Sequence, residues 1–460
     1  MLGNLGLLAG LALLIIMALR GVNILVAALT ASLVVAVTNQ LGIPATLLEH
    51  FPAGPLGAFT FAGNFFVLFL TGAIFGKMMS ASGAAASIAN AIIHWLGATR
   101  TLLVTVLVCG LLTYGGVVLF VVVFTMYPLG IALMREANLP RRLFCGATAL
   151  GAGTFTMTAL PGTPSIHNVI AASALGTDLF AGILPGLAAA VVMFGGGIWY
   201  LERQWTKAKA QGEGYVDNAR DRQMEAMAPK LENGPGWRMA LAPMGVVLGS
   251  IMVPRIATAL GWVNETTPLV GELFNFANSQ PIIWPSIALT LGAASCVVFF
   301  RNLREQAMEA LGEGANDSIM PLLNTAAVIG FGGVVTQTEG FGVFSSSVMA
   351  LDLPPLISVV FSVSLVSAIV GSSSGGLQIF MQTFADSYLD MGVDPEALHR
   401  IATVASGGLD SLPHCGAVIA MLTIMGIKHR EGYKDIFMVT VAIPVLATVA
   451  ALAVAMPLYG

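Results

Sequence analysis

Charged residues are scarce in this chain. They make up 10% of its 460 residues, whereas hydrophobic residues make up 56%. A water-soluble domain usually carries about 25% charged residues, so this chain has too little polar surface to cover a globule in water. Its repeated apolar stretches are long enough to cross a hydrocarbon layer of about 30 Å. The composition therefore excludes a soluble globular protein and indicates a polytopic membrane protein.

Cysteine and the common catalytic motifs are also sparse or missing. The four cysteines stand singly inside apolar stretches, whereas a disulfide framework or a zinc site needs clustered spacing. We interpret them as small buried hydrophobic residues. The chain has no HExxH or GxSxG motif, and His167, His414 and Asp410 lack the local spacing of metal ligands. We therefore predict no enzyme activity, no cofactor, no bound metal and no nucleic-acid partner.

Two distant parts of the chain carry the same unusual features in the same order. The first half has Ser82-Gly83, Tyr114-Gly115-Gly116 and Leu160-Pro161, and the second half has Glu339-Gly340, Ser374-Gly375-Gly376 and Leu412-Pro413. The corresponding positions are separated by 257 residues (83 to 340), 260 (115 to 375) and 252 (161 to 413). This near-constant separation indicates an internal duplication. In a membrane transporter, matched interruptions of this kind point to the binding site.

Apolar stretches predict five membrane crossings in each half. They cover 4–20, 21–40, 62–80, 142–174 and 178–202, and then 237–257, 281–300, 321–339, 400–427 and 433–459. Two further stretches, 100–136 and 354–392, are broken near their glycine pairs and predict re-entrant hairpins. Because five is odd, successive halves must lie upside down relative to each other. The predicted fold is an all-α membrane protein with ten transmembrane helices and two re-entrant hairpins in two inverted repeats, with broken helices at the midplane.

Each repeat is predicted to contain a scaffold part and a transport part. The first repeat is 1–202 (scaffold 1–60, transport part 61–202), and the second is 237–460 (scaffold 237–320, transport part 321–460). Residues 203–236 are rich in charge and in Gly, Asn and Gln, and we predict a solvated cytoplasmic linker without chemistry. Residues 301–318 predict an amphipathic helix at the membrane interface, and 44–60 occupy the equivalent place in the first half.

The basic residues support this layout independently, because Lys and Arg favour cytoplasmic loops. With the 203–236 linker inside, alternation places all of the 20 basic residues on the cytoplasmic side except Arg255 and Arg400. The opposite side receives a group of acidic residues that includes Asp386 and Asp390. Both termini are then expected on the periplasmic side of a bacterial inner membrane.

Four interruptions are expected at membrane depth: the two hairpin tips and the two Leu-Pro breaks. Irregular backbone at that depth is tolerated only where protein or a water-filled cavity covers it. If each interruption starts a new half-helix, four positive helix N-termini point into one cavity, and such ends bind anions without Lys or Arg. The sequence shows no basic residue near these interruptions, so we predict a carboxylate site formed by dipoles. The alternative is that the glycines merely allow close helix packing.

Polar side chains gather at the same four places. The backbone amides of Gly115, Gly116, Gly375 and Gly376 are predicted to hold the carboxylate. Hydroxyls and amides suited to reading the substrate's hydroxyl groups are carried by Thr113, Tyr114, Thr158, Thr163, Ser165, Asn168, Ser373, Ser374, Ser411 and His414. Taken singly, a Ser or Thr in a spanning helix usually bonds its own backbone, so only the clustering favours a binding role.

Few ionisable groups are expected at depth, and each is a functional candidate because a buried charge in a bilayer is expensive. Asp410 and His414 lie one helical turn apart around the second Leu-Pro pair. A carboxylate beside an imidazole can exchange a proton near neutral pH, so we predict Asp410 and His414 as proton-coupling residues, with His167 as a third candidate. The alternatives are that Asp410 caps the following half-helix and that His167 is a satisfied packing residue.

The second Leu-Pro motif resembles a known family. The run Gly407-Gly408-Leu409-Asp410-Ser411-Leu412-Pro413-His414-Cys415-Gly416, with Tyr433-Lys434-Asp435-Ile436 after it, is similar to the gluconate:proton symporter (GntP) family of the ion-transporter superfamily. The hairpin around Tyr114 and the stretch Ala159–Pro164 share this resemblance. It implies proton-driven transport of small hydroxy acids, such as gluconate or 3-hydroxybutyrate, by a homodimer with a scaffold and a moving transport domain. The first hairpin departs from the family form by having no acidic residue.

Together these observations predict an elevator-type secondary transporter that imports a small organic anion with protons. Sodium coupling is the alternative mechanism, because unwound carbonyls with Ser372, Ser373, Ser374 and Asn168 are groups that a Na⁺ site uses. A passive channel is a further alternative, but it would need a continuous polar pore, whereas the sequence places polar groups only at four depths. The expected partners are the anion, the coupling ion, the lipid bilayer and a second copy of the chain.

Overall fold

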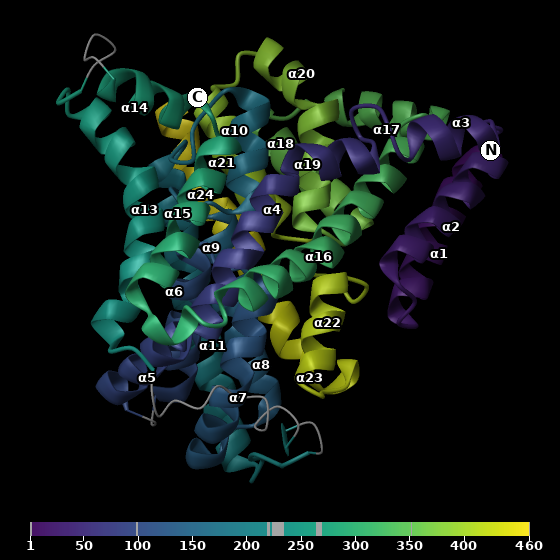
Figure 1. The fold of residues 1–460 in the computed structure, drawn as a ribbon. Coiled ribbons are helices and arrows are strands. Elements are labelled where there is room, and N and C mark those ends of the chain that lie inside the picture. The colour runs from purple at the N-terminus through teal and green to yellow at the C-terminus, as the bar shows by residue number, and fades with distance from the viewer. Residues whose placement is uncertain are drawn as a thin grey trace.

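The protein is a bundle of helices. The structure, a computed structural model, describes residues 2–97, 100–218, 221–222, 234–263, 269–350 and 352–459. Every regular element in these ranges is a helix (Figure 1). The all-α class is therefore confirmed.

The first half begins with two helices that form a separate arm. Its helices are α1 (Leu2–Leu19), α2 (Ile24–Thr38), α3 (Ile43–Ala45), α4 (Ala58–Ala81), α5 (Ala84–Leu96), α6 (Thr101–Tyr114), α7 (Leu119–Ala137), α8 (Arg141–Gly153), α9 (Phe155–Thr158), α10 (Ile166–Leu175) and α11 (Ile183–Ala210). A π-helix at Thr46–His50 follows α3.

The second half repeats this order. Its helices are α13 (Trp237–Ala259), α14 (Val270–Ser279), α15 (Ile283–Phe299), α16 (Ala307–Val335), α17 (Glu339–Met349), α18 (Pro355–Val370), α19 (Ser373–Thr383), α20 (Ala385–Asp390), α21 (Pro395–Ser406), α22 (Gly416–Ile424), α23 (His429–Phe437) and α24 (Ile443–Tyr459). A π-helix at Met438–Ala442 joins α23 to α24.

Long helices from the two halves pack against each other. Helix α4 packs along α16, and α11 packs along α24. The arm of α1 and α2 packs on α16 through a small apolar cluster that includes Leu14, Val35 and Phe331. Both chain ends lie at the upper end of Figure 1, whereas α7 and α23 lie at the lower end.

Fewer helices are long enough to cross a membrane than the sequence predicts. In the described ranges, six helices are long and apolar enough to cross a membrane, or seven if the bent pair α14–α15 counts as one span. Several predicted crossings consist instead of shorter helices (α1 and α2) or of broken ones (α8–α10 and α21–α22). The count of ten stays a prediction.

The expectation of a separate interfacial helix at 301–318 is wrong. Only Arg301–Leu303 forms a separate turn, and α16 then runs without a break from Ala307 to Val335. Its polar first half lies against α4, because Glu313 pairs with Lys77 at 2.8 Å and Gly314 packs on the backbone of Ile74. Helices α5 and α17 were not predicted. They follow α4 and α16, and they begin at the Ser82-Gly83 and Glu339-Gly340 pairs.

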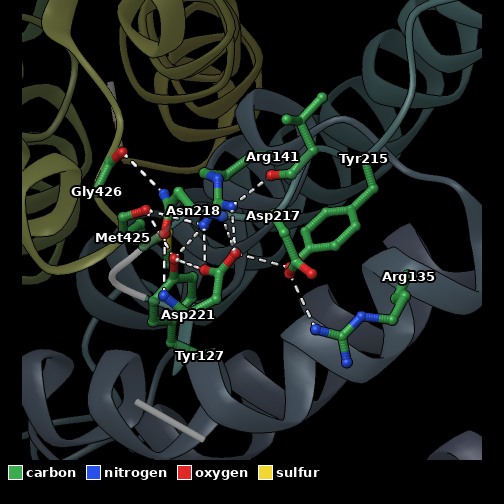
Figure 2. Close-up of polar contacts among 10 residues, drawn as sticks. Tyr127, Arg135, Arg141, Tyr215, Asp217, Asn218, Asp221, Met425 and Gly426 are labelled. Carbon is green, nitrogen blue, oxygen red and sulfur yellow. Dashed lines mark hydrogen bonds and ion pairs between the residues drawn. The ribbon is translucent and has the colours of Figure 1, made fainter. Parts of the chain in front are cut away.

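The linker is less solvated than its composition indicates. Figure 2 shows Asp221 inside a polar cluster at the ends of α7, α8 and α22. The Asp221 carboxylate accepts hydrogen bonds of 2.6 Å from each Arg141 terminal nitrogen and of 2.7 Å from Tyr127 and Tyr215. Asn218 and Arg141 donate to the final carbonyls of the α22 segment, at Gly426 and Met425.

A second bridge lies beside this cluster. Arg142 binds the carboxylates of Glu213 and Asp435 at 2.7 and 2.6 Å, and Tyr200 donates to the other oxygen of Asp435. The hydrogen bonds from Arg142 hold the pKa of Glu213 below its usual value. Because Asp221 and Asp435 are both buried, the prediction of a solvated linker is wrong at Asp221.

We expect Asp221→Asn to destabilise the protein by about 3 kcal/mol, because it leaves Arg141 without its buried partner. Burial by itself raises the pKa of Asp221, but the hydrogen bonds from Arg141 and Tyr127 outweigh burial and hold the pKa below its usual range. The charged form therefore stabilises the fold above the ordinary Asp pKa of about 3.9, and this contribution is lost as the pH falls below it.

The measurement is the apparent Tm of purified wild-type and variant protein across this pH range. The gap between the two should be wide at neutral pH and narrow in acid. Asp217→Asn is the matched control, because Asp217 binds Arg135 and Tyr215 in the same segment but its side chain is 60% exposed, and its Tm should stay near wild type. An Asp221 variant as stable as the Asp217 variant at neutral pH would contradict the prediction.

Candidate functional site

The first hairpin and the first Leu-Pro point are both interrupted. Helix α6 ends at Tyr114, Gly116 adopts a φ of +96°, and α7 begins at Leu119. The first broken span stops at Thr158 and resumes at Ile166. The predicted breaks in the first half are confirmed.

The second half is interrupted in the same two ways. Helix α18 ends at Val370, Gly371 has a φ of +66°, and the Ser372 side chain caps α19. The hairpin tip therefore lies just before Ser373–Gly376, which form the first turn of α19. The second broken span ends at Ser406 and resumes at Gly416.

The four interruptions lie next to one another. The Tyr114 hydroxyl at the first hairpin donates to the Pro161 carbonyl in the first break at 3.0 Å. A Cβ on Gly407 would lie 2.9 Å from the Thr158 side chain, so the two breaks touch. A Cβ on Gly371 would lie 2.6 Å from the His414 ring, so the second hairpin touches the second break. Residues from both halves thus form one polar centre.

A chain of polar contacts runs through this centre. His167 Nε2 lies 2.8 Å from the Ser373 hydroxyl. Ser373 also interacts with the Asp410 carboxyl, which accepts a hydrogen bond of 3.1 Å from Ser411. The structure therefore brings together His167, Ser373, Asp410 and Ser411, which the sequence analysis selected from three separate interruptions.

Around these contacts, several polar atoms are buried and have no hydrogen-bond partner among the described residues. They are Thr163 Oγ1, His167 Nδ1, His414 Nε2 and Ser367 Oγ. A buried donor or acceptor that is left unpaired costs about 1–3 kcal/mol, so four of them in one place favour a site that a polar ligand completes. Ser367 was not selected from the sequence. Its packing against Gly376 in the hairpin, rather than any sequence pattern, brings it here.

Other selected side chains are occupied by their own backbone. The hydroxyls of Thr113, Thr158 and Ser165 donate to carbonyls of Cys109, Thr154 and Met157. Asn168 donates to the Leu160 and Thr163 carbonyls at 3.3 and 3.1 Å. For these four residues, the structure gives local backbone contacts rather than free groups.

The four predicted glycine amides do not face an anion. Gly115 and Gly116 donate to the Leu111 and Thr113 carbonyls, because they end α6 rather than begin α7. Gly375 and Gly376 donate to the side chain and carbonyl of Ser372, which caps α19. These four amides are therefore engaged within their own helices, which counts against their holding a carboxylate.

The N-terminus of α22 is the most open of the four helix starts. At its N-cap only the Cys415 sulfur, a weak acceptor, contacts the Ala417 and Val418 amides, and Pro413, Gly416 and Ala417 are exposed. His414 lies directly before the helix, with its unpaired Nε2. A helix start whose N–H groups lack a strong acceptor favours negative charge nearby.

The sequence predicts no basic residue near the interruptions, but the folded structure places one beside the first break. Arg400 of α21 is fully buried, and its guanidinium contacts the first break at the Ala159 carbonyl (3.3 Å) and Asn168 Oδ1 (2.9 Å). Arg255, the other basic residue that the topology left outside, pairs with Asp178 at 2.7 Å. Apart from its place outside the positive-inside pattern, nothing along the chain points to Arg400, because its contacts come from residues about 220 to 240 positions away.

Two cavities in the described structure lie away from this centre. The larger, of about 490 Å³, lies between residues 49–56, the end of α16 and the end of α19. The smaller, of about 20 Å³, lies beside the Asp178–Arg255 pair. No group of three His, Cys, Asp or Glu side chains in the described residues could hold a metal ion.

A family model described as GntP family permease matches residues 4–385. The chain belongs to the GntP permease family. This family member is 39% identical over 394 residues to the uncharacterized transporter YxjC of Bacillus subtilis, covering 82% of this chain and 83% of the relative. It is 26% identical to the high-affinity gluconate transporter of Escherichia coli, covering 85% and 84%. The family is one of membrane permeases rather than enzymes.

Solved structures share the fold of this GntP permease. The YdaH transporter of Alcanivorax borkumensis matches with a TM-score of 0.54 and 15% identity, covering 87% of this chain and 89% of the other. MtrF of Neisseria gonorrhoeae matches with a TM-score of 0.52 and 14% identity, covering 91% and 83%. At these identities the likeness shows the fold alone.

We expect Gly376→Ala to destabilise this permease by about 2 kcal/mol, because the second hairpin has no room for a methyl group. A Cβ on Gly376 would lie 2.5 Å from the Ser367 Cα. Gly342→Ala is the control, because nothing lies within 4 Å of a Cβ added there. The apparent Tm of the purified variants measures the difference, and equal Tm values would show that the hairpin packing is looser than described.

Proposed function

We propose that this protein is a secondary active transporter that imports a small hydroxycarboxylate, such as gluconate or 3-hydroxybutyrate, together with protons. The observation that carries the proposal is the meeting of four helix interruptions around Asp410, Ser373 and His167, with unpaired buried polar atoms beside them. Interrupted helices from two halves that meet in one place are the usual substrate site of secondary transporters.

The chemistry of the centre supports an anionic, hydroxylated substrate. The open start of α22 and the His414 ring next to it would receive the carboxylate. The unpaired hydroxyls of Thr163 and Ser367 would bind the substrate's hydroxyl groups. A relative named as a gluconate transporter supports the same substrate class.

Asp410 is proposed as the proton-coupling residue. It lies in an irregular segment between two half-helices and interacts with the hydroxyl groups of Ser411 and Ser373, and no cation pairs with it in the described part of the chain. Such a carboxyl can gain or lose a proton as its surroundings change, because a charge at membrane depth is costly. Ser373 joins it to His167 and would relay changes at the second hairpin to the first broken span.

The remaining features of the proposal concern architecture. Two inverted repeats, an elevator-like movement, a homodimer and periplasmic termini in a bacterial inner membrane accompany this function. Both chain ends lie at the opposite end of the bundle from α7, which contacts the linker between the halves, and this supports an odd number of crossings in each half (Figure 1). The polar cluster between the linker and the ends of α7, α8 and α22 would lie on the cytoplasmic side.

We expect Asp410→Asn to abolish proton-driven uptake while sparing exchange of substrate across the membrane. An amide keeps the shape of the carboxyl but cannot carry a proton. Radiolabelled gluconate or 3-hydroxybutyrate uptake into proteoliposomes, under separate proton and sodium gradients, measures this. Asp390→Asn is the control, because Asp390 is exposed at the end of α20, and it should transport like wild type.

The outcomes separate the mechanisms. Active uptake that is unchanged in the Asp410 variant would refute its role. A response to sodium alone would replace proton coupling with sodium coupling, and flux that never saturates would indicate a channel.

We expect a thermal-shift screen against C3 to C6 hydroxy acids to identify the substrate class. Stabilisation grows as RT ln(1 + [L]/Kd), so weak binders at millimolar concentration should raise the Tm. Acids without a hydroxyl group serve as matched controls and should stabilise less. Equal shifts for hydroxylated and plain acids would argue against hydroxyl recognition by Thr163 and Ser367.

A further inference from the structure

Arg400 joins the two halves of the protein at the first break. It belongs to α21 in the second half, yet every hydrogen bond of its guanidinium goes to the first half. Nε donates to the Ala181 carbonyl at 2.9 Å, and the terminal nitrogens reach the carbonyls of Ala159 and Leu179 and the Asn168 side chain. The side chain is fully buried.

Two glycines at the start of α11 form the socket of this side chain. A Cβ on Gly182 would lie 2.4 Å from Arg400 Cβ, and a Cβ on Gly186 would lie 3.0 Å from Arg400 Cδ. Gly182 also has a φ of +60°, which favours glycine. The absence of side chains at Gly182 and Gly186 therefore leaves the space that the Arg400 side chain occupies.

The charge of Arg400 is unusual for its surroundings. Among the described residues no carboxylate forms an ion pair with it, and Asp178 acts on it only from farther away. A buried charge without a partner is costly. Its forked donors fit several carbonyl oxygens at once, which a lysine ammonium cannot reproduce.

The contacts of Arg400 decide how Asn168 faces the break. Asn168 Oδ1 accepts from Arg400 at 2.9 Å, so its amide nitrogen turns towards the carbonyls of Leu160 and Thr163. His399, next to Arg400, is 3.5 Å from the same oxygen and is fixed by Thr177 at 2.7 Å. In this arrangement the carbonyls of Ala159, Leu160 and Thr163 accept hydrogen bonds. The Thr163 hydroxyl has no partner among the described residues.

We propose that Arg400 is a positioning residue of the substrate site, which acts through Asn168 and the Ala159 carbonyl to hold the 159–165 break in its binding shape. The effect on the break stands by itself, whereas the effect on substrate rests on the proposed function. Arg400 does not touch the substrate. Arg400 is thus a basic residue at the first break, where the sequence predicted none, and it contacts the backbone of the break and Asn168.

Hydrogen exchange tests the positioning directly and needs no substrate. In Arg400→Gln and Arg400→Lys, amides of residues 155–170 should exchange at least tenfold faster than in wild type, because bonds to a charged donor are lost. Residues 407–415, the second break, should keep their wild-type rates. Arg304→Gln is the matched control, because exposed Arg304 also caps carbonyls, those of Val297 and Val298, and it should change neither break.

Uptake of gluconate into proteoliposomes tests the consequence for binding. Both Arg400 variants should raise the half-saturating concentration at least tenfold, while Arg304→Gln leaves it unchanged. If wild-type protein transports neither gluconate nor 3-hydroxybutyrate, that result counts against the proposed function, and hydrogen exchange alone decides the role of Arg400.

A third variant covers failure of the Arg400 variants to fold. Asn168→Asp keeps Arg400 and gives it a carboxylate partner, but it removes the amide donor to Leu160 and Thr163, so the first break should again exchange faster. Wild-type exchange at 155–170 in these variants would overturn the proposal. So would full rescue by Arg400→Lys, or an equal increase at both breaks, because each would show that fork geometry at the first break is not what Arg400 supplies.

Discussion

Irregular backbone inside an apolar bundle must find hydrogen-bond partners, and this constraint governs the centre of the protein. Each broken helix leaves N–H and C=O groups that neither water nor lipid can satisfy. At the first break, Asn168 serves the Leu160 and Thr163 carbonyls, Tyr114 serves Pro161, and Arg400 serves Ala159. These three partners come from α10, α6 and α21, and because Arg400 of α21 belongs to the second half, the first break is fully satisfied only when both halves are assembled.

The two breaks satisfy this constraint differently. The first break is surrounded by side-chain donors and is largely buried. At the second break, Tyr433 donates to the Ser411 carbonyl, but α22 begins without a side-chain cap and its first residues are exposed. The first break is therefore the more enclosed of the two, and the second is the more accessible.

The polar cluster at the other end of the bundle joins the same elements a second time. Arg141, Tyr127 and Asn218 bind the carbonyls that end the α22 segment, while α22 begins at the open break (Figure 2). One nine-residue helix therefore connects the linker to the site.

The sequence by itself determined the helical membrane class, the family and the four interruptions, because scarce charge, long apolar stretches and Gly or Leu-Pro breakers act locally. It also selected Asp410, Ser373 and His167, since polar groups at membrane depth stand out against an apolar background. It did not determine which donors are free. The Gly115 and Gly376 amides donate to carbonyls of their own helical segments. Most of the 301–318 segment, predicted to be a separate interfacial helix, is the first part of α16. Only the tertiary structure brought Arg400 to the first break and Asp221 to Arg141, because those contacts join residues with no pattern along the chain.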